Sequence, residues 1–192
     1  MISIGITGSF AVGKSSILNM LAQKNYKTFV ADKIVAEFYQ SEDIKKQIMK
    51  FHSSLKSFDK VLIAKLLFTD SAFKKQVTSL IHPYVEEELK NFIAKNKAEK
   101  IIFSEIPLLF EVGFEQYFDY IITVYCSEKN RLIRAKHREN FSFKKFRQIR
   151  KNQLTQIEKI NLAHFAINTD INLLKLEKKI DQLIQRIECL PI

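Results

Sequence analysis

Short apolar runs alternate along this chain with stretches in which apolar residues recur every three or four positions. The short runs are typical of buried strands and lie at 1–7, 27–31, 100–105, 120–125 and 165–167. The helical spacing predicts helices over 14–24, 131–150 and 171–187. Strands that alternate with helices predict the α/β class, with a parallel sheet and helices on both of its faces.

The stretch 41–97 differs from the rest, because it is rich in Lys, Gln and Glu and has no strand pattern. Its apolar residues have helical spacing, as in Ile63 and Leu66. We therefore predict a helical insertion at 41–97 in a core of residues 1–40 and 98–192. With 192 residues, 46% of them hydrophobic, the chain is expected to form one compact molecule.

The chain is basic, with 31 Lys and Arg against 21 Asp and Glu and a formal net charge of +10. The excess is concentrated between Ser127 and Lys151, where ten basic residues stand against two acidic ones. Such a charge attracts polyanions, whether nucleic acid, acidic membranes or phosphorylated small molecules.

Neither membrane insertion nor secretion is indicated. No apolar run approaches the length of a membrane span, and the N-terminus lacks the basic and apolar regions of a signal peptide. Cys126 and Cys189 have neither metal-ligand spacing nor the pattern of a disulfide framework. We therefore expect a cytoplasmic protein with reduced thiols and no membrane partner.

Residues 8–15, Gly-Ser-Phe-Ala-Val-Gly-Lys-Ser, match the pattern G-x-x-x-x-G-K-[ST] at every fixed position and are called the phosphate loop below. Backbone N–H groups of such a loop surround phosphates, and the following helix adds its positive end. Lys14 is expected to reach the β- and γ-phosphates of ATP, and Ser15 to hold Mg²⁺. The predicted nucleotide contacts in this region are Gly8, Ser9, Ala11, Val12, Gly13, Lys14, Ser15 and Ser16. With this loop, the predicted fold class is a P-loop α/β fold of three layers, a parallel sheet with helices on both faces.

Two carboxylates follow predicted strands. Asp32 ends the second strand and Glu105 ends the strand at 100–105. Because parallel strands end at one edge of the sheet, both are expected to face the phosphate loop. We assign Asp32 as the group that accepts the proton of an acceptor hydroxyl, and Glu105 as an outer partner of Mg²⁺ or of the acceptor. The alternatives are a helix N-cap for Asp32 and a strand-end surface carboxylate for Glu105.

Three arginines in the basic stretch, Arg131, Arg134 and Arg138, are spaced to share one face of a helix. Such a face can close over ATP as a lid and supply cations to the transition state. A solvated charged helix and a nucleic-acid patch are the alternatives.

Further motifs accompany the phosphate loop. They are Ala31-Asp32, Asp59-Lys60 with the run 66–70, Ile81-His82-Pro83, the segment 105–111 (Glu-Ile-Pro-Leu-Leu-Phe-Glu), and Leu132-Ile133-Arg134 with Arg138-Glu139. Together with the phosphate loop these motifs resemble the dephospho-coenzyme A kinase family along most of the chain. The segment 105–111 is more specific than the loop, because P-loop kinases in general do not share it.

The resemblance implies a nucleotide-binding core, a helical domain over the coenzyme substrate and a mobile lid at about residues 134–152. It implies transfer of the γ-phosphate of ATP, with Mg²⁺, to the ribose 3′-hydroxyl of dephospho-coenzyme A, the last step of coenzyme A synthesis. It supports Asp32, Lys14 and Arg134 as catalytic residues and Arg138 as a nucleotide contact. The implied substrate contacts are Asp32, His82, Pro83, Glu105, Pro107 and Leu108. Taken alone, His82 is interpreted as a helix-end packing residue and Pro83 as a first-turn residue.

The chain departs from the family pattern in places. Phe10-Ala11-Val12 stands where glycine is more usual, and Val30 replaces the first Asp of a D-A-D motif. Glu105 replaces Asp, and Lys159 stands near a position where the family favours Arg.

Two other functions stay open from the sequence. One is another P-loop kinase for a nucleoside or small molecule. The other is a nucleic-acid-binding P-loop NTPase, motivated by the charge, although Phe141, Phe143 and Phe146 could equally pack the lid. We expect a monomer without a stable nucleic-acid partner, with weak self-association left open.

Overall fold

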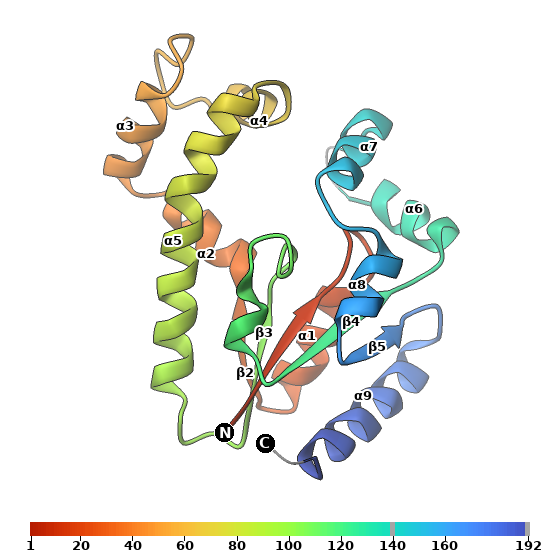
Figure 1. The fold of residues 1–192 in the computed structure, drawn as a ribbon. Coiled ribbons are helices and arrows are strands. Elements are labelled where there is room, and N and C mark those ends of the chain that lie inside the picture. The colour runs from red at the N-terminus through yellow and green to blue at the C-terminus, as the bar shows by residue number, and fades with distance from the viewer. Residues whose placement is uncertain (139–140, 191–192) are drawn as a thin grey trace. The chain divides into compact units, whose positions relative to one another are not determined.

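The computed structural model describes residues 1–138 and 141–190. Its centre is a five-stranded sheet in the order β2-β3-β1-β4-β5, and β1 runs parallel to β3 and β4, as β5 does to β4 (Figure 1). The strands are β1 (Ile2–Thr7), β2 (Lys27–Val30), β3 (Ile101–Glu105), β4 (Tyr120–Tyr125) and β5 (Phe165–Asn168). Every residue of β1 and β3 is buried, including the polar Ser3, Thr7, Ser104 and Glu105, as expected of central strands covered on both faces. The predicted α/β class with a parallel sheet is confirmed.

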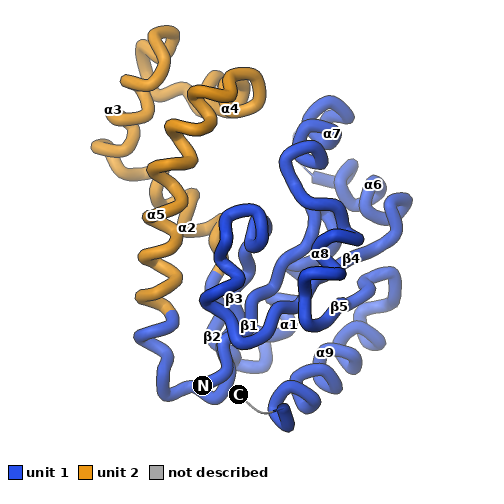
Figure 2. Tube along the Cα trace, in the orientation of Figure 1, with its two compact units in different colours: residues 1–29, 93–192 blue, residues 30–92 orange. Residues whose placement is uncertain are grey.

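The chain forms two compact units, residues 1–29 with 93–192, and residues 30–92 (Figure 2). The helices of the first unit are α1 (Lys14–Gln23), α6 (Glu128–Lys136), α7 (Phe143–Lys151), α8 (Gln156–Leu162) and α9 (Leu173–Glu188), with the short 3₁₀ helix η1 (Phe114–Tyr117). Helix α1 contacts α9, and α8 contacts β4. These helices flank the sheet that carries the phosphate loop.

The second unit is helical from Ala31 onward. It contains α2 (Ala31–Phe38), α3 (Glu42–Lys50), α4 (Lys60–Thr69) and most of α5 (Ser71–Lys95). Its own core is built from Phe38, Ile48, Leu55, Ile63, Leu66, Phe73 and Val77. The helical character expected of 41–97 is confirmed, whereas the domain boundaries and the substrate-binding role of that stretch stay predictions.

One predicted helix is wrong. Residues 131–150 do not form a single helix, because α6 ends at Lys136 and α7 begins after Ser142. The Ser142 hydroxyl accepts the Lys145 N–H at 3.1 Å and starts α7 as an N-cap. Glu139, from the lid motif, lies outside the described residues. Helix α8 lies outside the predicted elements, although Thr155 and Glu158 form a capping box at its start.

Two local interpretations are also corrected. Val30, not Asp32, occupies the N-cap of α2, because the helix already begins at Ala31. Pro83 is not a first-turn residue, since it lies inside the 25-residue helix α5, and His82 is likewise inside that helix. Apolar periodicity on both sides of Pro83 outweighs the local cost of its missing N–H. Among the described residues, no helix is long and apolar enough to cross a membrane.

Candidate active site

The phosphate loop joins β1 to α1 through a backbone that favours glycine. Gly8 has φ 148° and Gly13 φ 102°, and a Cβ added to Gly8 would collide with the Val124 carbonyl oxygen. Ala11 has φ 66°, a left-handed conformation that an alanine adopts only at some cost. Three positive φ values within six residues curl the chain into a concave turn, which is the geometry of an anion-binding loop.

The residues around this turn fit the phosphates of a nucleoside triphosphate. Helix α1 directs its N-terminal end at the loop, with Gly13 as N-cap. The hydroxyls of Ser15 and Ser16 belong to exposed residues. Within the described part of the chain, the buried Ser9 Oγ makes no hydrogen bond, so its hydroxyl can donate one to a bound phosphate oxygen.

Lys14 and Glu105 meet at the loop. The Lys14 Nζ donates to the Gly8 carbonyl at 2.9 Å and the Ser9 carbonyl at 3.3 Å, and it lies 3.6 Å from Glu105 Oε1. Their side chains are only 10% and 8% exposed. The sheet register explains the meeting, because Glu105 pairs with Ile6, two residues before Gly8. Glu105 is therefore buried and is not the surface carboxylate of the alternative interpretation.

The arginines of α6 face the phosphate loop. Arg131 is 3% exposed, and its Nε donates to the Phe10 carbonyl at 2.9 Å. An η-nitrogen of Arg134 donates to the Val12 carbonyl at 3.0 Å, and the guanidinium also binds Thr169 Oγ1 and the Thr169 carbonyl. The solvated-helix alternative is wrong for Arg131. The transition-state role of Arg134 stays a prediction.

Arg138 completes this set, because its guanidinium carbon lies 5.0 Å from the centroid of the Phe10 ring. That distance is typical of a cation–π contact. All three predicted lid arginines thus contact either the backbone or a side chain of the phosphate loop.

Sequence reasoning did not identify the buried pair of Lys159 and Glu111. Lys159 is 0% exposed, and its Nζ donates to Glu111 Oε2 at 2.9 Å, to the Pro107 carbonyl at 2.7 Å and to Thr7 Oγ1 at 3.4 Å. Burial lowers the pKa of Lys159, and the Glu111 carboxylate opposes that shift. The signal was present in part, since Glu111 ends the motif 105–111 and Lys159 stands near the family's arginine.

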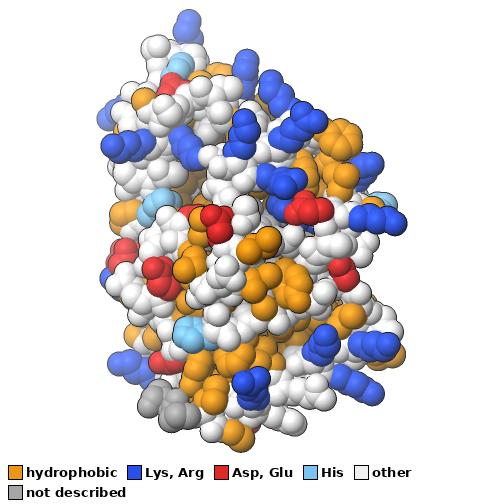
Figure 3. Space-filling model, turned by 45° about the vertical axis from the view of Figure 1, so that its right-hand side comes forward, with side chains coloured by type: hydrophobic (Ala, Val, Ile, Leu, Met, Phe, Trp, Pro, Cys, Tyr) orange, Lys and Arg blue, Asp and Glu red, His pale blue; other side chains and the backbone are white. Residues whose placement is uncertain are grey.

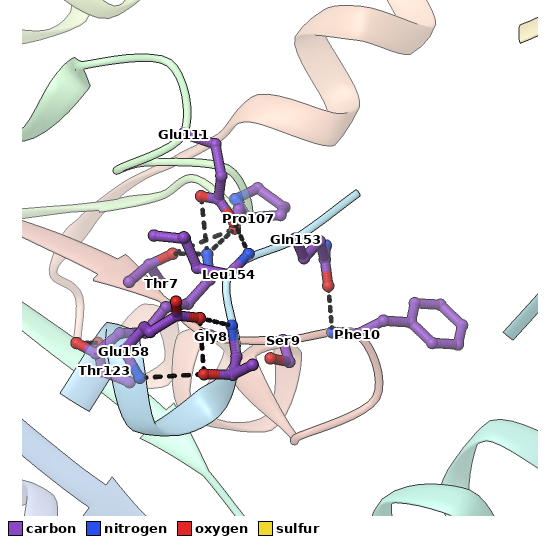
Figure 4. Close-up of polar contacts among 12 residues, drawn as sticks. Thr7, Gly8, Ser9, Phe10, Pro107, Glu111, Thr123, Gln153, Leu154 and Glu158 are labelled. Atoms are coloured by element: carbon purple, nitrogen blue, oxygen red, sulfur yellow. Dashed lines mark hydrogen bonds and ion pairs between the residues drawn. The ribbon is translucent and has the colours of Figure 1, made fainter. Parts of the chain in front are cut away.

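The other carboxylate oxygen of Glu111 accepts the Leu154 N–H at 2.8 Å, and the Gln153 side chain accepts the Phe10 N–H at 3.1 Å (Figure 4). The turn after α7 is therefore bonded both to the motif 105–111 and to the phosphate loop.

The first unit brings together Lys14, Glu105, Pro107, Arg134 and the phosphate loop. Pro107 and Leu108 are half-buried and follow β3 after the buried Ile106. Asp32, His82 and Pro83 belong to the second unit, so their predicted approach to the nucleotide stays a prediction. Burial lowers the pKa of His82.

These features define a P-loop kinase. The first strand of a parallel sheet leads into a phosphate loop, and a buried lysine and a strand-end carboxylate lie beside that loop. Similar solved structures include a protein from Thermus thermophilus, with TM-score 0.83, 25% identity and 97% of both chains covered. A dephospho-CoA kinase from Campylobacter jejuni has TM-score 0.70 and 24% identity, over 97% of this chain and 96% of the other.

Sequence comparison gives the family. The family model for dephospho-CoA kinase matches residues 2–175. A dephospho-CoA kinase of Rickettsia typhi is 43% identical over 189 residues, which cover 98% of this chain and 99% of the relative. The chain belongs to the dephospho-CoA kinase family, whose reaction is the ATP-dependent phosphorylation of dephospho-CoA in coenzyme A synthesis. The predicted family, enzyme class and activity are confirmed.

Proposed function

We propose that this protein transfers the γ-phosphate of ATP to the ribose 3′-hydroxyl of dephospho-coenzyme A, which yields coenzyme A and ADP. The observation that carries the proposal is the buried pair of Lys14 Nζ and Glu105 Oε1, 3.6 Å apart at the mouth of the phosphate loop. It supplies a cation for phosphates and a carboxylate at the end of the neighbouring strand. Membership of the kinase family supports the choice of acceptor.

The phosphate loop is the proposed triphosphate site. Lys14 exchanges the carbonyls of Gly8 and Ser9, which it contacts at 2.9 and 3.3 Å, for the β- and γ-phosphates. The proposed nucleotide contacts are Gly8, Ser9, Ala11, Val12, Gly13, Lys14, Ser15, Ser16 and Arg138. These contacts concentrate donors around a polyanion, so binding favours the triphosphate.

Mg²⁺ is the proposed metal, held by the hydroxyl of Ser15 and by Glu105, directly or through water, together with phosphate oxygens. Bound there, it neutralises charge on the phosphates. Hard oxygen donors of this kind suit Mg²⁺ better than a softer metal.

Asp32 is the proposed general base. It accepts the proton of the 3′-hydroxyl as that oxygen forms its bond to the γ-phosphorus, while the bond from the γ-phosphorus to the oxygen bridging to ADP breaks. Arg134 and Lys14 stabilise the charge of the transferring group. Dephospho-coenzyme A is proposed to contact Asp32, His82, Pro83, Glu105, Pro107 and Leu108.

The test is purified protein with Mg-ATP and dephospho-coenzyme A, followed by mass spectrometry of the product. We expect a product heavier by one phosphoryl group, placed on the 3′-oxygen. A parallel panel of nucleosides, nucleotides and small alcohols separates this function from another kinase activity. ATP binding without phosphorylation of dephospho-coenzyme A contradicts the proposal.

The contacts of the three lid arginines support a lid over ATP better than a nucleic-acid-binding surface. Arg131, Arg134 and Arg138 contact the phosphate loop. Apolar and acidic side chains also lie on the face that Figure 3 shows. A steep dependence of DNA or RNA affinity on salt concentration would favour the alternative.

We further propose that the protein acts in the cytoplasm and as a monomer. Cys126 and Cys189 are both free thiols, which fits a reducing compartment. Light scattering across protein concentrations tests the monomer, and it also detects weak self-association.

A further inference from the structure

Phe10 is the third residue of the phosphate loop. Its N–H, its carbonyl and its ring all contact segments that lie far along the chain. Its N–H donates to Gln153 Oε1 at 3.1 Å, and its carbonyl accepts from Arg131 Nε at 2.9 Å. Its ring lies 6.4 Å, centroid to centroid, from the ring of Phe146 in an edge contact and under the guanidinium of Arg138. The loop is therefore attached to distant segments through the N–H, the carbonyl and the ring of this residue.

The arginine bonds to the carbonyls of the loop favour the conformation that an anion requires. Ala11, with φ 66°, separates two carbonyls that arginines of α6 bind, those of Phe10 and Val12. In an anion-binding turn the N–H groups point inward and the carbonyls outward. Guanidinium donors on the outward carbonyls favour that orientation, and each charge-assisted bond is stronger than a neutral one.

Gln153 is itself held in place. The adjacent Leu154 N–H donates to Glu111 Oε1 at 2.8 Å, and Glu111 Oε2 binds the buried Lys159 at 2.9 Å. Figure 4 shows the Gln153 amide directed at the Phe10 nitrogen, while the Phe10 ring points away from that bond. The acceptor that holds Phe10 thus sits on a turn whose backbone is anchored from the opposite side.

The packing around the Phe10 ring is close. Phe10 lies against a small core of Ala11, Ala135 and Phe146, and Phe141 and Leu132 pack on it. The cavity next to this core has a volume of only about 20 Å³, roughly the space of one water molecule. The Phe10 ring therefore packs against residues of both α6 and α7.

We propose that Gln153 and Arg131 are positioning residues for triphosphate binding, which act by holding the Phe10 peptide groups so that the phosphate loop is preorganised. The inference rests on the proposed function, since it assumes that the loop binds ATP. It assigns the turn after α7 a role in nucleotide affinity and not in the choice of the acceptor.

Gln153→Met tests the proposal, because it keeps the length of the side chain and removes the acceptor. The matched control is Gln116→Met, at an exposed glutamine that donates to the Gly113 carbonyl at 3.0 Å. Titration calorimetry gives the dissociation constant of ATP, steady-state kinetics give kcat and both KM values, and hydrogen exchange reports the Phe10 amide.

For Gln153→Met we expect the dissociation constant and the KM of ATP to rise about threefold to tenfold, the effect of one hydrogen bond. Exchange of the Phe10 amide should accelerate, while the KM of dephospho-coenzyme A and kcat at saturating ATP change by less than about twofold. Arg131→Lys, which keeps the charge and loses the Nε donor, should act in the same direction. The control should match the wild type.

Wild-type ATP affinity in Gln153→Met, together with a faster-exchanging Phe10 amide, overturns the proposal. So does an equal loss of ATP affinity, dephospho-coenzyme A affinity and kcat, because that pattern reports general damage. If the wild type binds ATP and leaves dephospho-coenzyme A unchanged, the proposed function fails while the ATP affinities still decide this inference.

Discussion

Lys159 Nζ lies 2.9 Å from Glu111 Oε2, and the lysine is fully buried while the glutamate is 15% exposed. Removal of one partner leaves a buried charge uncompensated. We expect Glu111→Gln to lower the free energy of unfolding by about 3–5 kcal/mol, measured by urea denaturation.

Glu177→Gln is the control for that variant, because the pair of Glu177 and Lys24 lies at the surface and should contribute little to the free energy of unfolding. The double variant Lys159→Met/Glu111→Leu removes both charges and should recover most of the loss. If Glu111→Gln and Glu177→Gln lower the free energy of unfolding equally, the buried pair stabilises the fold no more than the surface pair does.

Lys14→Ala should reduce phosphoryl transfer on the order of 10²–10³-fold, since it removes a cation from the transferring phosphate. The assay is the initial rate with saturating Mg-ATP and dephospho-coenzyme A. Lys24→Ala is the control, because Lys24 lies just past the end of α1 and pairs with Glu177 and Asp181. Near-normal turnover in Lys14→Ala refutes the assignment of the phosphate loop.

Asp32→Asn is nearly isosteric, so it should keep the fold and the affinity for ATP. If Asp32 is the base, the rate falls by roughly two to four orders of magnitude. Asp43→Asn, at a side chain that is 87% exposed in α3, serves as the control and should be fully active. An unchanged rate with weakened ATP binding assigns Asp32 to binding instead.

The lowered pKa of Asp170 predicts that the free energy of unfolding depends on pH. Burial opposes its charge, but hydrogen bonds from Asn130 Nδ2 at 2.8 Å and the Ser127 N–H at 2.6 Å prevail and hold its pKa below 3.8. A carboxylate with a lowered pKa stabilises the fold above its unfolded pKa, and that contribution is lost as the pH falls through the folded pKa.

Asp170→Asn should therefore unfold more easily than the wild type at neutral pH. The difference in free energy of unfolding should shrink once the pH falls below about 4, as the wild-type carboxyl becomes protonated. Denaturation curves from pH 7 to pH 3 measure it. A difference that stays constant over this range would mean that the ionised form makes no special contribution.

Local patterns predicted much of the fold correctly. Strands β1 and β4 and helix α1 follow from apolar periodicity and from the glycine spacing around the phosphate loop. The single helix expected over 131–150 failed because the apolar and basic spacing continues past Lys136, whereas the Ser142 cap starts a new helix. Periodicity measures a repeat along the chain, and it is insensitive to a break that one capping residue creates.

By itself, the sequence determined the class of the protein, the phosphate loop, the order of the strands along the chain and the family motif at 105–111, because each depends on residues close together in the chain. Only the tertiary structure decided that Lys159 pairs with Glu111, 48 residues away, and that Gln153 holds Phe10, 143 residues away. Such pairs depend on sheet register and on packing between distant segments, and no local pattern in a single sequence encodes them.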